Sequence, residues 1–259
     1  MVKAIREAQT HSNWVQHNEP YEAACREFVD KILTRSPEND FWSDFLPFQN
    51  EVSAYGVYNS LSQTMLKIAC AGLPDFYQGS ELWDLNPVDP DNRRPVDFAQ
   101  RQRMLKEITS RSAVHSIHRF FPSGRNGGHS PPYALRDASV KLFLIYRGLR
   151  ARRANRSLFD TGDYRPASVA GSRAEHLVAF SRIAGPARAL VVVPRFLTSL
   201  VRPGEPPLGP RVWEDTSIAL PAHTPSVWHN PITDETVRIQ GQIPVAGILR
   251  RFPAALPLG

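Results

Sequence analysis

The sequence has few cysteines and no long apolar run. Cys25 and Cys70 are its only cysteines among 259 residues, too few for the disulfide framework of a small secreted domain. We expect both thiols to be buried, reduced packing residues. No apolar run approaches the roughly 18 residues that a membrane-spanning helix needs, and the first residues are mixed and charged, unlike a secretory signal. These absences predict a soluble, cytoplasmic protein with no membrane partner.

The charge of the chain is moderately basic and partly local. The formal net charge is +6, and five arginines cluster between residues 147 and 156. A nucleic-acid partner would require that cluster to lie on a recognised motif with interleaved aromatic residues, and none is present. Positive side chains are favourable at the end of a helix, where the helix dipole is negative. We therefore expect these arginines to end a helix, and we predict no nucleic-acid partner.

The distribution of proline divides the sequence into a proline-poor first part and a proline-rich second part. Sixteen of the 23 prolines follow Phe121. Helical spacing of apolar residues comes first, and short apolar runs between prolines and glycines come later. The spacing predicts helices over 2–9, 19–33, 39–50 (interrupted or kinked near Pro47), 51–71, 98–108 and 135–153. The later runs predict strands over 177–181, 189–193, 217–220 and 236–239.

These patterns predict an α+β fold with a domain boundary near residue 156. The first domain, residues 1–155, is helix-rich. The second, residues 156–259, is expected to be a small all-β domain of sandwich type. The sequence contains no internal repeat.

The segment 71–98 carries the densest polar chemistry of the chain. A short strand over 75–78 that ends at Gly79 would place the next side chains at the carboxyl edge of a sheet, where α/β sheets and barrels bind ligands. Glu81 and Trp83 would then lie at that edge, followed by Asp89, Asn92, Arg93 and Arg94. A sugar suits such a set, because an aromatic face covers its C–H surface while charged groups bond its hydroxyls. Three prolines, at 87, 90 and 95, lower the conformational entropy of the loop.

Each of these residues also has a plainer interpretation. Arginines in an acidic loop commonly fix the loop through ion pairs, and this applies to Arg93 and Arg94. Glu81 is equally compatible with a supporting role and with ligand contact. Trp83 is compatible with half-buried packing as well as with a sugar platform.

The residues 72–81, GLPDFYQGSE, resemble the eighth-strand segment of the α-amylase family of glycoside hydrolases. That family's pattern, Gly-x-Pro-x-x-Tyr-x-Gly-x-Glu, is matched at Gly72, Pro74, Tyr77, Gly79 and Glu81. The extension to Phe98 is similar, more specifically, to the maltooligosyl trehalose synthase family. Further stretches resemble the same family, so that the similarity covers nearly the whole chain: 3–22, 44–49, 59–68, 162–166 and 190–195.

This resemblance implies a reaction and an incomplete enzyme. The family converts the reducing-end α-1,4 linkage of a maltooligosaccharide into an α,α-1,1 linkage by retaining intramolecular transglycosylation, without a metal or organic cofactor. No segment here matches the three motifs that carry the superfamily's catalytic carboxylates. The resemblance therefore implies the last helices and eighth strand of a (β/α)8 barrel plus a β domain. We expect this chain to be inactive alone, and its partner to be the missing N-terminal catalytic part.

The resemblance also implies which residues would meet the substrate. No catalytic residue is assigned, and no metal ligand. The expected maltooligosaccharide contacts are on the rim of the eighth strand: Tyr77, Glu81, Trp83, Asp89, Asn92, Arg93 and Arg94. His11 and Trp14 are a second set of candidates, because the stretch around them would follow the seventh strand. His11 is equally compatible with an ordinary loop histidine.

Two other functions stay open at this point. The chain could be part of another α-amylase-type hydrolase or glucosyltransferase. It could also be a non-catalytic carbohydrate-binding module, in which Trp213 and Trp228 would form a stacking platform instead of core packing. An incomplete barrel would further leave the apolar stripe of the 51–71 helix exposed. We would then expect aggregation or a partner chain.

Overall fold

The computed structural model describes residues 1–86, 89, 91–121, 137–221, 224–239 and 241–259. It is a mixed structure of helices and small sheets, as the predicted α+β class requires. The chain forms two compact units, Met1–Val52 and Ser53–Gly259. Among the described residues, no helix has the length and apolar character needed to cross a membrane.

The first unit contains helices α1 (Val2–Ala8) and α2 (Glu19–Leu33), both predicted from the sequence. Asn18 caps α2, since its side chain accepts a hydrogen bond from the Tyr21 amide at 3.2 Å. Glu22 lies on the inner face of α2 and is 3% exposed. It accepts two hydrogen bonds of 2.8 Å from Arg6 and one of 2.6 Å from Ser12. This buried carboxylate ties α1 and the following loop to α2.

Helix α3 (Phe41–Ala69) is continuous across the boundary of the two units. Of the predicted interruption or kink near Pro47, the interruption is wrong, because Pro47 lies inside the helix. A proline removes one intrahelical hydrogen bond, and here the hydrogen-bonded turns on both sides are retained. The two helices predicted over 39–50 and 51–71 are therefore one helix.

The apolar stripe of α3 is buried, contrary to the expectation that it would be exposed. Leu61, Met65 and Ile68 are each 0% exposed. Two hydrogen bonds join this part of α3 to the C-terminal half of the chain, from Tyr55 to the Val201 carbonyl and from Ser62 to the Pro194 carbonyl. The β-rich region, which the sequence treated as a separate domain, covers the stripe.

In the described part of the second unit, five shorter helical elements lie between α3 and the first strand. Asp97 caps the first full helix among them and accepts from the Gln100 amide at 2.7 Å. Their bounds are η1 (Asp91–Arg93), α4 (Phe98–Thr109), α5 (Ala113–Phe120), α7 (Ser139–Ala154) and α8 (Arg156–Asp160). Helix α4 confirms the helix predicted over 98–108. Helix α7 confirms the body of the one predicted over 135–153, of which residues 135–136 lie outside the described residues.

Antiparallel strands make up the described sheets. One sheet has the order β1 (Asp163–Pro166), β3 (Leu177–Ala184), β4 (Ala187–Pro194), with Val178 opposite Val193. A second has the order β2 (Ser168–Ala170), β5 (Ser217–Ala219), β8 (Gln242–Pro244), and β6 (Val227–Asn230) pairs with β7 (Glu235–Arg238). The remaining elements are η2 (Ala174–His176), η3 (Leu197–Ser199), α9 (Pro210–Trp213) and α10 (Val245–Ile248). The four predicted strands are confirmed as β3, β4, β5 and β7.

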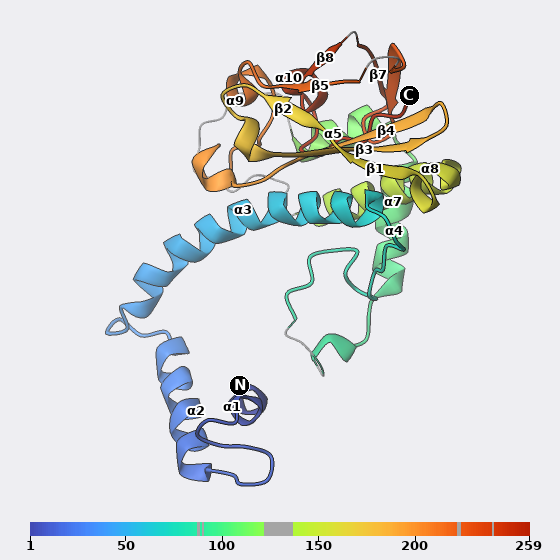
Figure 1. Ribbon diagram of the computed structural model, residues 1–259. Coiled ribbons are helices and arrows are strands. Elements are labelled where there is room, and N and C mark those ends of the chain that lie inside the picture. The colour runs from blue at the N-terminus through green and yellow to red at the C-terminus, as the bar shows by residue number, and fades with distance from the viewer. Residues whose placement is uncertain (87–88, 90, 122–136, 222–223, 240) are drawn as a thin grey trace. The chain divides into compact units, whose positions relative to one another are not determined.

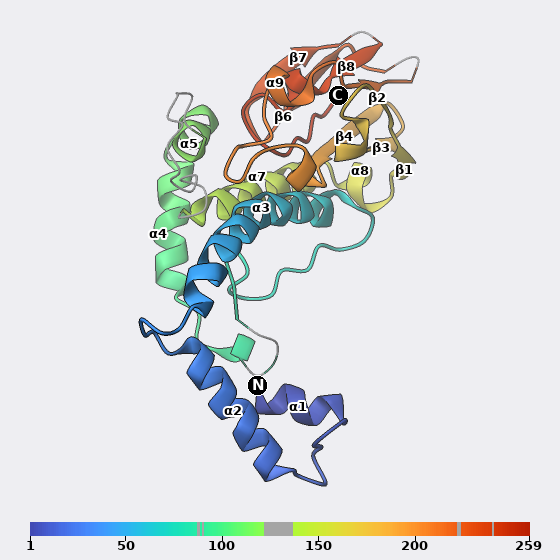
Figure 2. The same cartoon turned by 90° about the vertical axis from the view of Figure 1, so that its left-hand side faces the viewer.

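The core of the second unit draws on both sides of residue 156. Phe121 packs against Tyr58 and against Phe252, and Phe143 packs against Phe252 as well. Helices α3 and α7 lie side by side against one sheet (Figure 1, Figure 2). Trp213 and Trp228, 0% and 1% exposed, are core residues. The proposed boundary at 155/156 stays a prediction.

Two further expectations need correction. Residues 75–78 do not form a strand: 75–77 have no regular structure, and Gln78 lies in a turn. A strand is defined by backbone hydrogen bonds to a neighbouring strand, and none of the described strands pairs with this segment. Cys25 and Cys70 are free but only partly buried. Residues 122–132, whose glycine, serine, asparagine and proline content predicts a loop, lie outside the described residues.

Candidate functional site

The segment 70–98 leaves α3 at a point fixed by Arg152. This side chain is 7% exposed and comes from the last turn of α7. Its Nη1 donates to the carbonyls of Ile68 at 2.7 Å and Cys70 at 3.2 Å, and its Nη2 donates to the Gly72 carbonyl at 2.6 Å. The last carbonyls of a helix lack intrahelical donors. Arg152 supplies that donor and so sets where the candidate segment begins.

The turn at 77–82 is closed by Glu81 and by Arg101 of α4. Glu81 Oε2 accepts from the Gly79 amide at 3.0 Å and from Arg101 Nε at 3.0 Å. Arg101 Nη2 donates to the Gly79 carbonyl at 2.9 Å. Gly79 has φ of 95°, a left-handed conformation that glycine adopts without steric cost. These hydrogen bonds give Glu81 a supporting role in the turn, and its predicted contact with a substrate stays a prediction.

Trp83 is half-buried beside a lysine of α7. The Lys141 ammonium lies 5.8 Å from the centre of the Trp83 ring and donates to the Leu82 carbonyl at 3.2 Å. Burial lowers the pKa of Lys141, and the nearby Lys67 lowers that pKa further, while Asp84 and Glu81 oppose the shift. The Trp83 indole N–H is buried without a hydrogen-bond partner among the described residues. Trp83 is therefore a packing residue, and its indole N–H is a hydrogen-bond donor that is not used by the described residues.

The remaining rim residues are more exposed. Arg93 forms an ion pair with Asp89, as the loop-fixing interpretation expects. Tyr77 is 49% exposed, and Arg94 is exposed as well. The side-chain oxygen of Asn92 is buried with no hydrogen-bond partner within the described residues. Trp83 and Asn92 thus each hold a polar atom that a ligand hydroxyl could satisfy.

His11 and Trp14 belong to the first unit and lie together there. The His11 ring lies 4.9 Å from the Tyr21 ring, and Arg6 lies over Trp14 at 5.3 Å. Trp14 is 54% exposed. Their assignment to the substrate site stays a prediction.

Sequence reasoning missed three residues that shape this region: Arg101, Lys141 and Arg152. Arg101 lies on the polar side of a helix, where an arginine is common and does not indicate a tertiary contact. Lys141 opens the apolar run KLFLIYRGL, and a lone cation beside buried positions could have suggested an internal partner. Arg152 was taken with its neighbours as a helix-ending charge, and no pattern pointed to α3.

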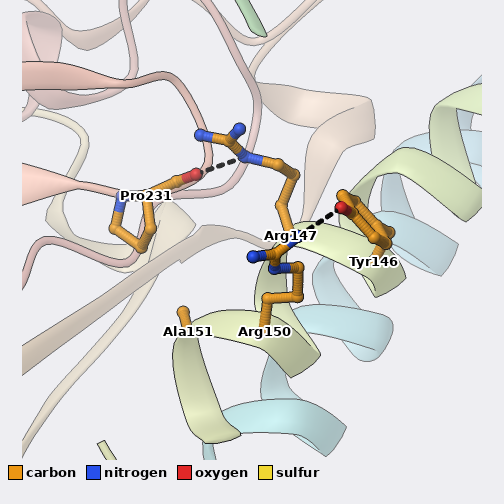
Figure 3. Close-up of a pocket in the computed structure, with 5 residues that line it drawn as sticks. All are labelled: Tyr146, Arg147, Arg150, Ala151 and Pro231. Atoms are coloured by element: carbon orange, nitrogen blue, oxygen red, sulfur yellow. Dashed lines mark hydrogen bonds between the residues drawn. The ribbon is translucent and has the colours of Figure 1, made fainter. Parts of the chain in front are cut away.

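A cavity of about 350 Å³ lies elsewhere, between α7 and the turn after β6. It is lined by Tyr146, Arg147, Arg150, Ala151 and Pro231 (Figure 3). None of the residues predicted for the substrate site lines it. Among the described residues, no group of three or more His, Cys, Asp or Glu side chains could hold a metal ion.

Comparison with known proteins gives consistent relatives. No family model matches the chain. A maltooligosyl trehalose synthase of Mycobacterium tuberculosis (strain CDC 1551 / Oshkosh) is 31% identical over 98% of this chain and 27% of its own length. The structure of maltooligosyltrehalose synthase from Arthrobacter ramosus matches with 28% identity and a TM-score of 0.72, over 99% of this chain and 29% of that chain.

A second solved structure agrees with these two relatives. A maltooligosyl trehalose synthase from Sulfolobus tokodaii matches with 25% identity and a TM-score of 0.61, over 100% of this chain and 28% of that chain. The chain therefore spans between a quarter and a third of the length of the relatives it matches. The matched region is the C-terminal part of these enzymes.

Proposed function

We propose that this chain forms the C-terminal part of a maltooligosyl trehalose synthase and takes part in its reaction. In that reaction the reducing-end α-1,4 linkage of a maltooligosaccharide becomes an α,α-1,1 linkage. The observation that carries the proposal is the match to the Mycobacterium tuberculosis enzyme over 98% of the chain. The burial of Trp213 and Trp228 removes the platform on which a carbohydrate-binding module would have depended.

The proposal includes an architecture. Residues 1–155 would be the last helices and eighth strand of a (β/α)8 barrel, and residues 156–259 would be the C-terminal β domain. Residues 73–77 belong to no helix, strand or turn in the structure, which leaves their backbone available to pair as a strand beside neighbouring barrel strands. The partner of this chain would then be the N-terminal catalytic part of the same enzyme.

The chemistry of the proposed reaction is retaining. One carboxylate attacks the anomeric carbon while a carboxylic acid protonates the leaving oxygen. The glycosyl-enzyme is then captured by a hydroxyl of the released glucose instead of by water. The carboxylates that would carry these steps are not assigned to this chain, and the steps call for no metal or organic cofactor.

This chain would hold and orient the sugar. Tyr77 would cover a sugar face, and Asp89, Asn92, Arg93 and Arg94 would bond hydroxyls. Glu81 would act indirectly, because it fixes the turn that carries Tyr77 and Trp83. Holding a reacting group in a closed site can contribute several kcal/mol, on the order of 7–11 in the best intramolecular cases.

The test is a chimera with the Arthrobacter ramosus enzyme. Its matched 29% is replaced by this chain, and the products from maltopentaose are followed. We expect reducing ends to disappear without shortening of the chain. Release of glucose or maltose as the main product would instead identify a hydrolase, and a folded but inert chimera would refute the proposal.

A further inference from the structure

The cavity between α7 and the turn after β6 is walled by two arginines whose positions are already fixed. Arg147 Nε donates to the Pro231 carbonyl at 2.5 Å, and Arg147 Nη2 forms an ion pair with Asp234. Arg150 Nη1 donates to the Tyr146 hydroxyl at 2.6 Å. Figure 3 shows both guanidinium groups beside the cavity. Side chains held in place before binding lose little conformational entropy when a ligand arrives.

These arginines still have donors to offer. Arg147 Nη1 and Arg150 Nε and Nη2 have no protein partner in the part of the chain that the structure describes. Arginine has five N–H donors in a rigid fork, which match the oxygens of a phosphate group two at a time. The cavity thus presents preformed donors without a matching acceptor.

The local charge favours an anion. None of the described residues that line the cavity is acidic. The adjacent Asp234 is engaged by Arg147, and the following residue, Glu235, is engaged by Arg250 and Arg251. Within the described residues, Arg150 has no carboxylate partner. One arginine charge at the cavity is therefore uncompensated.

The size and remaining walls of the cavity favour an organic anion. About 350 Å³ is much more room than a lone phosphate ion fills and lies within the range of small-ligand sites. Ala151, Pro231 and the Tyr146 ring supply an apolar side. We propose that this cavity binds a phosphate monoester, with the phosphate held by Arg147 and Arg150 and the organic part against the apolar wall.

Glucose 6-phosphate is the probe. Inorganic phosphate and glucose are the control ligands, because they carry its phosphate and its sugar separately. Binding is measured by calorimetry at constant ionic strength, because exposed charges are screened by salt. We expect saturable binding of the ester, weaker binding of inorganic phosphate and none of glucose. Equal or tighter binding of inorganic phosphate, or binding of glucose alone, would overturn the assignment.

Arg150→Gln is the decisive variant, and Arg153→Gln is its control. Both residues are exposed on α7, and only Arg150 lines the cavity. Loss of a charged hydrogen-bond donor should weaken binding about tenfold or more, whereas the control should bind as the parent does. An equal loss in both variants would show a diffuse charge effect and refute the site.

Tyr146→Phe guards against a folding defect. It removes the hydroxyl that positions Arg150 and keeps the ring. We expect weaker binding of the ester with an unchanged melting temperature. Unchanged affinity in both Tyr146→Phe and Arg150→Gln would contradict the proposal. The measurement involves no catalysis, so its outcome is independent of the proposed function.

Discussion

Replacing Arg152 by methionine should loosen the joint between α3 and α7. Methionine keeps much of the apolar stem and removes the guanidinium. The change deletes the hydrogen bonds to the carbonyls of Ile68, Cys70 and Gly72, and the ion pair with Asp160. The end of α3 would then lack its capping donor, and the start of the candidate site would lose its anchor.

The cost follows from the burial of these acceptors. A buried polar group left without its partner costs about 1–3 kcal/mol. Ile68 is 0% exposed, while Cys70 is half-buried and Gly72 is exposed, so water can replace the donor at the last two carbonyls. We expect a loss in the free energy of unfolding of about 2–4 kcal/mol.

One effect works in the opposite direction. Burial lowers the pKa of Arg182, and the nearby charge of Arg152 lowers that pKa further. Removing Arg152 relieves this repulsion between two cations. The relief should be the smaller effect, because Arg182 keeps hydrogen bonds to the carbonyls of Phe159 and Gly162 at 2.9 and 2.7 Å.

Urea unfolding, followed by circular dichroism, measures the change. The control is Arg153→Met, an exposed neighbour on the same helix, for which we expect a change within about 0.5 kcal/mol. The slope with urea should be the same in all three proteins, since the surface exposed on unfolding is similar. A loss below about 0.5 kcal/mol for Arg152→Met would refute the capping argument.

Three further predictions concern other parts of the fold. Leu61→Ala should cost about 2–5 kcal/mol in the free energy of unfolding through the cavity it leaves, whereas the exposed Gln63→Ala should be near neutral; equal effects in urea titrations would show that the stripe of α3 is not core. Hydrogen bonds from Arg6 and Ser12 lower the pKa of Glu22 to about 2, from an unfolded value of about 4.5. The ionised Glu22 therefore stabilises the fold above pH 4.5, and this stabilisation is lost as the pH falls toward 2. In acid titrations, Glu22→Gln should lose this pH dependence of stability, and Glu38→Gln should keep it. Glu81→Ala should speed amide exchange at the turn it closes by roughly tenfold, and unchanged exchange would mean that the carboxylate does not hold the turn.

The first unit shows what local sequence signals can predict. Helix α2 has the predicted bounds, Glu19–Leu33, because capping and periodicity agree there. Asn18 caps the amino end, and the apolar residues recur every three or four positions. Information that sets a helix end is contained within a few neighbouring residues, so a single sequence is enough.

The interruption at Pro47 shows where such signals are insufficient. Proline predicts a break, yet α3 is continuous, because the loss of one hydrogen bond does not outweigh the bonded turns on both sides. The strand expected at 75–78 is absent for a different reason, which concerns distant residues instead of local ones. A strand requires partners that are distant in sequence, and no pattern within the segment could show that they are missing from the described strands.

The contacts within the candidate segment could be predicted only in part. The assignment of Glu81, Arg93 and Asp89 to a substrate site stays a prediction, and the structure shows only that Glu81 accepts from the Gly79 amide and that Arg93 pairs with Asp89. Arg101 and Lys141 donate hydrogen bonds to Glu81 and to the Leu82 carbonyl, and they lie on α4 and α7, which come later in the sequence than this segment. Their contacts depend on how the helices pack, which the spacing of charged residues along the sequence does not specify.

The most direct test of the sugar-binding role of segment 72–98 is the kinetics of Tyr77→Ala in the Arthrobacter ramosus chimera. Tyr77 is 49% exposed, and its phenol has no hydrogen-bond partner among the described residues. The fold should therefore be unaffected, and the melting temperature verifies this. We expect kcat/KM for maltopentaose to fall about three- to tenfold, the size of a lost aromatic contact, while Arg103→Gln on α4 leaves it unchanged. A Tyr77→Ala chimera with the parental kcat/KM would contradict the account.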